Sequence, residues 1–147
     1  MKTLPARTLA DAELASRLRL AVTRLARRLR TQLPGELSPS QLATLATVER
    51  LGPLTLGELS AAERVKPPTM TKIVGCLEEQ GLVSRTVDQS DRRVARVEAT
   101  AEGRRFLDQS RKQKDAYLAE RLRGLDPADR AALERAAAVL ERLLEAE

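Results

Sequence analysis

Residues 67–100 read PPTMTKIVGCLEEQGLVSRTVDQSDRRVARVEAT, and this stretch carries the most specific pattern in the chain. Its first part repeats apolar residues at the three- and four-residue spacing of a helix, which ends at Gly81. Two runs of alternating side chains, 83–87 and 94–99, follow and enclose the polar turn 88–93. A helix followed by a basic hairpin is the second half of a winged helix.

A short capped helix is predicted directly before this stretch. Thr55 and Glu58 have the spacing of a capping box, and the leucines on either side of the box are placed as a hydrophobic staple. This helix should end near Glu63, and residues 64–66 form a turn before the proline pair opens the next helix. The pattern of short helix, tight turn and second helix predicts a helix-turn-helix.

Four further helices are expected outside this part of the chain. Their predicted spans are about 10–32, 39–51, 101–123 and 127 to the end. The first and the last of them carry long apolar stripes. The stripe residues are Leu14, Leu18, Val22, Leu25 and Leu29 in the first helix, and Leu133, Ala136, Ala137, Leu140, Leu143 and Leu144 in the last. The predicted fold is therefore mainly α with a small β-hairpin wing.

Composition excludes several classes of function. The chain has 147 residues, which suits one domain with helical extensions, and it contains no His and a single Cys. Without imidazoles or several thiols, a metal site is not expected, and no cofactor-binding motif is present. Neither a general base of the usual kind nor a nucleophile elbow is found, so we expect no enzyme.

The N-terminal sequence, the single Cys and the net charge bear on the location and the partner of the protein. The N-terminus lacks a long apolar run, so neither a signal peptide nor a membrane span is expected, and an unpaired Cys fits a reducing cytoplasm. The net charge is +5, and residues 1–33 alone hold eight basic against two acidic side chains. The surplus suits a polyanionic partner, although solvated helix faces would also explain it.

The outer face of the helix that begins at Pro67 is a candidate for base contacts. On a helical wheel the apolar residues share one side, and small polar groups and one cation lie opposite or at its edge. The candidate major-groove residues are Pro68, Thr69, Thr71 and Lys72. Hydroxyls and an ammonium group can contact base edges or phosphates, whereas the alternative interpretation is an ordinary solvated face.

The tip of the hairpin is more specific. Arg92 and Arg93 are adjacent cations at a position where folding requires none. A narrow DNA minor groove attracts inserted arginine because its negative potential is enhanced there. Asp91 is close enough to pair with Arg93 and orient its guanidinium. The alternative is a charged tip that only adds solubility.

Two further sets of candidate residues are those expected to contact the DNA backbone and the single cysteine. The residues expected to reach DNA phosphates are Ser40, Arg64, Lys66 and Arg96. Cys76 lies beside the apolar stripe of its helix and has no neighbouring resolving Cys, so a partly buried structural role is favoured over an oxidant sensor.

The order of these elements resembles the MarR family of bacterial regulators (multiple-antibiotic-resistance type). The resemblance spans roughly 10–145 and is most specific at 91–100, DRRVARVEAT, which is similar to the Asp-x-Arg wing pattern of the family. GLVSR at 81–85 and TMTK at 69–72 resemble the segments that the family has before the wing and at the start of its recognition helix. The chain departs from the pattern at Ala99, where Leu is usual, and at Lys66, where a small capping residue is commoner.

The resemblance implies a sequence-specific, double-stranded-DNA-binding transcriptional regulator. It implies one MarR-like domain over 1–147, in which 34–100 is the winged helix-turn-helix and 10–33 and 101–147 are dimerisation helices. It further implies a homodimer on a pseudo-palindromic operator, usually a repressor, and release by a small, often phenolic or carboxylated ligand. The resemblance assigns no ligand-binding residues in this chain.

Three other interpretations stay open. A winged-helix protein-interaction module would bind an acidic partner with shallow salt dependence, whereas binding to duplex DNA should weaken steeply with salt. A membrane-surface role is suggested by the basic first helix, but that helix has no Trp or Phe anchor. Oxidant sensing through Cys76 is the third alternative.

Overall fold

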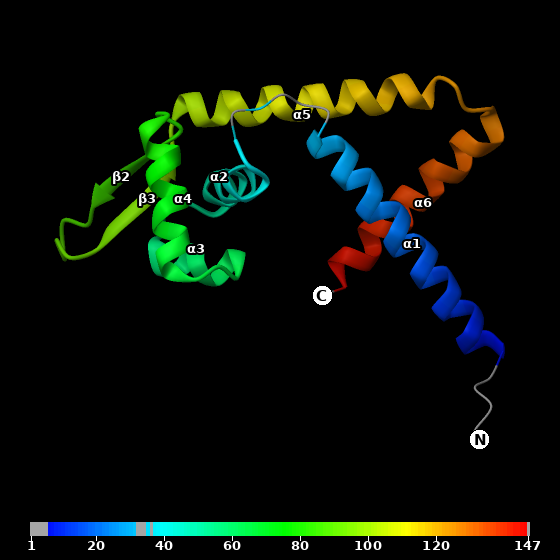
Figure 1. Ribbon diagram of the computed structural model, residues 1–147, viewed down its shortest axis with the longest axis horizontal. Coiled ribbons are helices and arrows are strands. Elements are labelled where there is room, and N and C mark those ends of the chain that lie inside the picture. The colour runs from blue at the N-terminus through cyan, green and yellow to red at the C-terminus, as the bar shows by residue number, and fades with distance from the viewer. Residues whose placement is uncertain (1–5, 32–34, 36, 147) are drawn as a thin grey trace. The chain divides into compact units, whose positions relative to one another are not determined.

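The computed structural model describes residues 6–31, 35 and 37–146 of the chain, and side chains from residue 9 onward. The described part holds six helices and three short strands, and Figure 1 labels the helices together with the strands β2 and β3. The elements are α1 (Ala6–Thr31), α2 (Pro39–Leu51), β1 (Leu54–Thr55), α3 (Leu56–Glu63), α4 (Pro67–Glu79), β2 (Val83–Val87), β3 (Ala95–Ala99), α5 (Ala101–Leu122) and α6 (Pro127–Glu145). The mainly α fold with a small β wing is thus confirmed.

The chain divides into two compact units, Met1–Arg111 and Lys112–Glu147. The first holds the helix-turn-helix, the sheet and the first half of α5, and the second holds the rest of α5 and all of α6. α5 begins at Ala101, two residues after Ala99, the last residue of β3.

Local capping determines where α2 and α3 begin. Ser38 accepts a hydrogen bond from the backbone N–H of Gln41, whose side chain accepts one from the N–H of Ser38, and Pro39 occupies the first helical position. Thr55 and Glu58 exchange the same pair of bonds at the start of α3. Each box satisfies two N–H groups that the first helical turn leaves without a partner. Both predicted capping boxes are therefore present.

The sheet has three antiparallel strands in the order β1-β3-β2. The hairpin of β2 and β3 was predicted, and its register pairs Val83 with Ala99 and Val87 with Ala95. β1 differs from the sequence prediction, in which residues 54–55 only lead into α3. Its two residues pair with Val97 and Arg96 of β3. β3 is consequently the central strand, and its backbone connects the wing to the start of α3.

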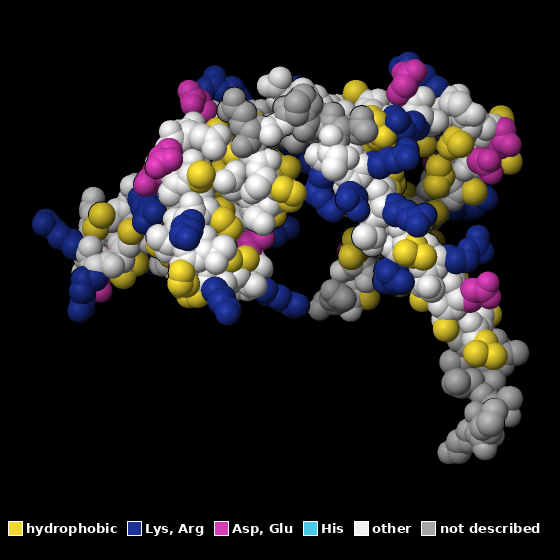
Figure 2. Space-filling view, viewed as in Figure 1, with side chains coloured by type: hydrophobic (Ala, Val, Ile, Leu, Met, Phe, Trp, Pro, Cys, Tyr) yellow, Lys and Arg dark blue, Asp and Glu magenta, His cyan; other side chains and the backbone are white. Residues whose placement is uncertain are grey.

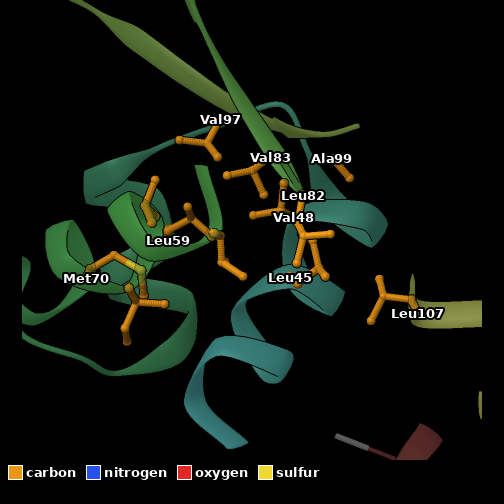
Figure 3. Packing of buried hydrophobic residues seen from close by; sticks show 12 residues of the cluster. Leu45, Val48, Leu59, Met70, Leu82, Val83, Val97, Ala99 and Leu107 are labelled. Atoms are coloured by element: carbon orange, nitrogen blue, oxygen red, sulfur yellow. The ribbon is translucent and has the colours of Figure 1, made fainter. Parts of the chain in front are cut away.

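One hydrophobic core holds the winged helix-turn-helix together. Figure 3 shows residues of α2, α3, α4 and the sheet converging on it, with Leu107 of α5 at its edge. The fully buried side chains include Leu45, Val48, Leu59, Met70, Val74, Leu77 and Val97. Burying a side chain of this size stabilises the folded state by about 1.5–3 kcal/mol. This core positions α4 and the wing relative to each other.

The junction between the wing and α5 is closely packed. The hydroxyl of Thr100 donates to the carbonyl oxygen of Gly81 at 2.6 Å and accepts from the backbone N–H of Gly103 at 3.0 Å, so Thr100 caps α5 as predicted. Gly103 is buried against the carbonyl oxygen of Leu82, and a Cβ there would lie only 2.1 Å from that atom. The start of α5 therefore packs directly against the segment that leads into β2.

α1 and α6 expose apolar residues along much of their length. Leu14 and Val22 of α1 and Leu143 of α6 are examples, with 62%, 47% and 60% of their surface exposed. In the second unit, a hollow of about 350 Å³ lies between the end of α5 and α6 and is lined by Leu122, Leu133 and Leu140 together with alanine and charged side chains. None of the described helices combines the length and the apolar character needed to span a membrane.

Candidate nucleic-acid interface

The turn between α3 and α4 directs the second helix of the motif. Arg64 ends α3 in the left-handed conformation, with φ 53°, and its N–H donates to the carbonyl of Ala61. The N–H of Val65 donates to the carbonyl of Ser60 at 3.0 Å, which completes a Schellman motif. Pro67 then occupies the first turn of α4, where a missing N–H costs nothing. Lys66 precedes it at the N-cap and makes no side-chain capping bond.

α4 has the two faces that its sequence predicts. The residues on the inner face are Met70, Ile73, Val74 and Leu77, all buried. The outer residues Pro68, Thr69, Thr71 and Lys72 are all exposed. Glycine at position 75 adds to this face, because a Cβ there would meet nothing within 4 Å. The outer face is therefore open, polar and free of bulky apolar groups.

The hydroxyl proton of Thr71 is already used in a hydrogen bond within α4. Its hydroxyl donates to the carbonyl oxygen of Pro67 at 3.0 Å, one helical turn earlier. With its proton committed to the helix backbone, the oxygen presents lone pairs outward and can accept a hydrogen bond. Amino groups of adenine or cytosine are the donors of that kind in the major groove.

The wing tip is organised by its own carboxylates. Asp88 accepts from the N–H and the hydroxyl of Ser90 at 2.9 and 2.7 Å, which closes the first half of the turn. Asp91 accepts from the backbone N–H of Arg93 at 3.1 Å and pairs with its guanidinium at 3.2 Å. The hydrogen bond from the Arg93 side chain, followed by the one from its backbone, holds the pKa of Asp91 below its ordinary value. The predicted pairing of Asp91 with Arg93 is thus present.

The Arg93 side chain is held in direction but remains exposed. Of its surface, 92% is open to solvent even though one edge of the guanidinium contacts Asp91. Arg92 is exposed beside it and forms no ion pair with any residue that the structure describes. Figure 2 shows Lys and Arg side chains projecting from the wing and from the region of α3 and α4. Residues 64–77 contain three cations and no carboxylate, so this surface is locally positive.

Comparison with known proteins gives this surface a context. A family model described as the MarR family matches residues 37–95, which include α2, β1, α3, α4 and β2. Over 136 residues the chain is 38% identical to an HTH-type transcriptional regulator of Mycobacterium tuberculosis, covering 92% of this chain and 95% of that protein. The chain belongs to the MarR family. It is a DNA-binding transcriptional regulator with a winged helix-turn-helix.

Solved structures agree with this assignment. A MarR family protein from Bacillus stearothermophilus is 27% identical, with a TM-score of 0.73 and coverage of 97% of this chain and 99% of that one. A variant of MepR from S. aureus bound to an oligodeoxyribonucleotide has a TM-score of 0.68 at 19% identity, covering 90% of this chain and 96% of that one. At that identity the second likeness concerns the fold alone.

The four expected phosphate contacts of this MarR-family chain lie in different surroundings. Ser40 is exposed in the first turn of α2, and Arg64 and Lys66 are exposed in the turn before α4. Arg96 differs, because its guanidinium lies 3.9 Å from Glu58 and 3.8 Å from Asp88. Two carboxylates therefore already compensate the charge of Arg96, which the sequence did not indicate.

A second ion pair at the wing was also missed. Arg85 of β2 lies 3.2 Å from Glu78 near the end of α4, so the wing is connected to the helix that presents the outer face. The two residues are seven positions apart and belong to different elements, and no periodic pattern relates them. Their contact follows from how the core folds β2 back toward α4.

The remaining chemistry of the site is limited. Across the described ranges, no group of three or more His, Cys, Asp or Glu could hold a metal ion. Cys76 is a free thiol and is partly buried, as the position beside the apolar stripe of α4 predicts. What this surface offers is hydrogen-bonding groups and positive charge.

Proposed function

We propose that this MarR-family regulator acts as a homodimer, binds a pseudo-palindromic operator and represses transcription until a small ligand releases it. The observation that supports this most strongly is the open face of α4 together with the oriented arginine of the wing, both in the same compact unit. A regulator of this kind works on the chromosome, so we place it in the cytoplasm.

In the proposed complex, the two α4 helices of the dimer enter successive major grooves about 34 Å apart. Thr69, Thr71 and Lys72 then face base edges and phosphates, and Pro68 packs beside them at the helix start. The wings reach the flanking minor grooves, where Arg93, oriented by Asp91, enters the groove and Arg92 binds phosphate.

The proposal of a homodimer draws on the apolar faces of α1 and α6. These helices expose leucines and valines that a lone chain leaves in water, at a cost of about 25 cal/mol for each Å². A second copy with the same faces is the partner that the family suggests. The residues 10–33 and 101–147 would then be the dimerisation part, and 34–100 the DNA-binding part.

Release by a small phenolic or carboxylated compound requires a hollow that can hold such a compound. A hollow of about 360 Å³ beside α2 and α5 is lined by Ala46, Thr47, Glu49, Arg50 and Arg111. Arg50 is exposed there, and a guanidinium suits a carboxylate ligand. We propose that the ligand binds in this hollow.

The proposal is tested by selecting DNA with the purified protein. Genomic fragments that it retains are sequenced, and the protected duplex is used in a gel-shift titration with the wild type and Arg93→Ala. We expect Arg93→Ala to weaken binding about tenfold while light scattering still reports a dimer. Arg123→Ala, which removes an exposed arginine in the turn directly after α5 and outside the winged helix-turn-helix, should bind like the wild type.

Unchanged affinity of Arg93→Ala would exclude the proposed minor-groove contact. If no duplex is protected and the binding of an acidic partner varies little with salt, the interaction-module alternative would replace DNA binding. A monomer in light scattering at micromolar concentration would overturn the proposed dimer.

A further inference from the structure

Arg96 lies at the centre of a chain of polar contacts that runs from the wing turn to the start of α3. It occupies the central strand β3, opposite Thr55 of β1 and Thr86 of β2. Its neighbour Val97 is fully buried, so alternation along the strand directs the Arg96 side chain to the face away from the core. Its side chain is 38% exposed.

The two ends of its guanidinium contact two different elements. Nη2 lies 3.8 Å from Oδ2 of Asp88, the first residue after β2, and Nη1 lies 3.9 Å from Oε2 of Glu58 in the first turn of α3. Both separations are those of ion pairs and exceed a hydrogen bond. The two ends of a planar guanidinium can face two carboxylates at once, whereas the single ammonium of a lysine occupies one point.

Each of these carboxylates also performs a second task. Asp88 uses Oδ1 to accept from the N–H and hydroxyl of Ser90, which shapes the wing turn, and leaves Oδ2 for Arg96. Glu58 accepts from the backbone N–H of Thr55 at 2.9 Å as part of the capping box of α3. Arg96 therefore joins the group that shapes the wing turn to the group that starts the first helix of the helix-turn-helix.

We propose that Arg96 is a positioning residue that sets the orientation of the wing relative to the helix-turn-helix, and that it does not bind DNA phosphate. This replaces the backbone contact that the sequence suggests for Arg96. It rests on the proposed function in one respect, since the wing must reach DNA for its orientation to affect affinity.

Removing Arg96 should change the conformational entropy of the wing more than the stability of the fold. Exposed ion pairs contribute little to the free energy of unfolding, so removing Arg96 should leave the fold intact. A wing that moves more in the free protein loses more freedom when DNA orders it, and that loss lowers affinity. A guanidinium flanked by two carboxylates is also a weaker ligand for phosphate than Arg92, for which no ion pair is found among the described residues.

The first test needs no DNA. Backbone ¹⁵N relaxation is measured for residues 88–94 in the free full-length protein, comparing the wild type, Arg96→Gln and Arg96→Lys, with Arg92→Ala as a control on the same wing. We expect both Arg96 variants to lower the order parameters of the turn while Arg92→Ala leaves them unchanged. Circular dichroism should show the wild-type helix content in all four proteins. Unchanged order in Arg96→Gln would overturn the proposal.

The second test uses the selected duplex in a double-mutant cycle. Arg96→Gln and Arg96→Lys should each weaken binding by about fivefold per chain. In the Arg93→Ala background the same substitution should have almost no further effect, because Arg96 acts through the wing that carries Arg93. Independent, multiplying effects together with near wild-type binding of Arg96→Lys would show a direct phosphate contact and overturn the proposal.

The two proposals fail in different ways. If Arg93→Ala binds DNA normally while Arg96→Gln still increases wing motion, the proposed minor-groove contact is wrong and the link through Arg96 stands. If Arg93→Ala weakens binding but Arg96→Gln changes neither motion nor affinity, the link through Arg96 is wrong and the proposed function stands.

Discussion

Arg64→Gly should separate the stability of this protein from its affinity for DNA. Arg64 ends α3 with φ 53°, a conformation that glycine adopts without penalty and that costs an L-residue about 1–2 kcal/mol. Its backbone N–H donates to the carbonyl of Ala61, and glycine keeps that bond. An exposed arginine therefore occupies a position whose backbone conformation favours glycine.

The expected magnitudes follow from these two features. Relief of the left-handed strain gains about 1 kcal/mol, and the greater freedom of glycine in the unfolded chain offsets about half of it, so Arg64→Gly should stabilise the fold by about 0.5 kcal/mol. If Arg64 neutralises one phosphate, its loss removes about 0.9 from the slope of log K against log salt. Relative to a 1 M salt reference, this change of slope makes binding at 0.1 M salt about eightfold weaker per chain.

The assay combines urea unfolding at one fixed protein concentration with anisotropy titrations of the selected duplex between 50 and 200 mM salt, a range of the order over which such slopes are resolved. Arg64→Lys is the matched control, because it keeps both the charge and the left-handed strain. We expect Arg64→Lys to resemble the wild type in stability and in salt slope. A less stable Arg64→Gly would show that no left-handed strain is relieved at this position. An unchanged salt slope would show that Arg64 contacts no phosphate.

The other predictions concern the packing of α5, acid stability and the thiol. Gly103→Ala should destabilise the fold by about 3 kcal/mol in thermal unfolding, because its Cβ would lie 2.1 Å from the Leu82 carbonyl oxygen, a backbone atom that cannot turn aside. Arg111 contacts Glu49 at 2.7 Å, and the hydrogen bond that the Arg111 guanidinium donates holds the pKa of Glu49 below the ordinary 4.5. That pair should therefore stabilise the fold above pH 4.5, by about 1 kcal/mol or less, and lose its effect as the pH falls through the lowered pKa; urea unfolding of the wild type and Glu49→Gln across pH 7 to 3 checks this. Cys76→Ser should bind the selected duplex like the wild type, before and after treatment with peroxide, since the thiol is partly buried.

Each of these has an outcome that contradicts it. Gly75→Ala is the control for Gly103→Ala, because its added Cβ meets nothing within 4 Å and should stabilise α4 by about 0.5–1 kcal/mol. Equal effects of the two substitutions would exclude the close contact at Gly103. A stability difference between wild type and Glu49→Gln that grows on acidification would reverse the sign expected for Glu49. Loss of DNA binding on oxidation in the wild type but not in Cys76→Ser would establish the oxidant-sensor alternative.

The predictions from sequence that are confirmed depend on residues close together in the chain. The two capping boxes join residues three positions apart, and Asp91 and Arg93 are two apart. The faces of α4 follow from the helical period within thirteen residues. In each case the local backbone geometry alone brings the groups into contact, so their spacing is sufficient to predict it.

Other features depend on tertiary structure. β1 is only two residues long, and it becomes a strand because β3 lies beside it. Arg96 and Glu58 are 38 positions apart, and Arg111 and Glu49 are 62 apart. For such ion pairs the sequence identifies each charged residue, but it does not show which opposite charge will lie beside it once the core has formed.

The helices, the turn between α3 and α4, the exposed face of α4 and the pairing at the wing tip thus follow from the order of the residues. That Arg96 faces two carboxylates, and that the wing contacts both helices of the motif through Glu58 and Glu78, follows only from the packing of the folded chain. The physical reason is that periodicity and caps act within one or two turns of chain, whereas the choice of an ion-pair partner depends on which surfaces the buried core brings together.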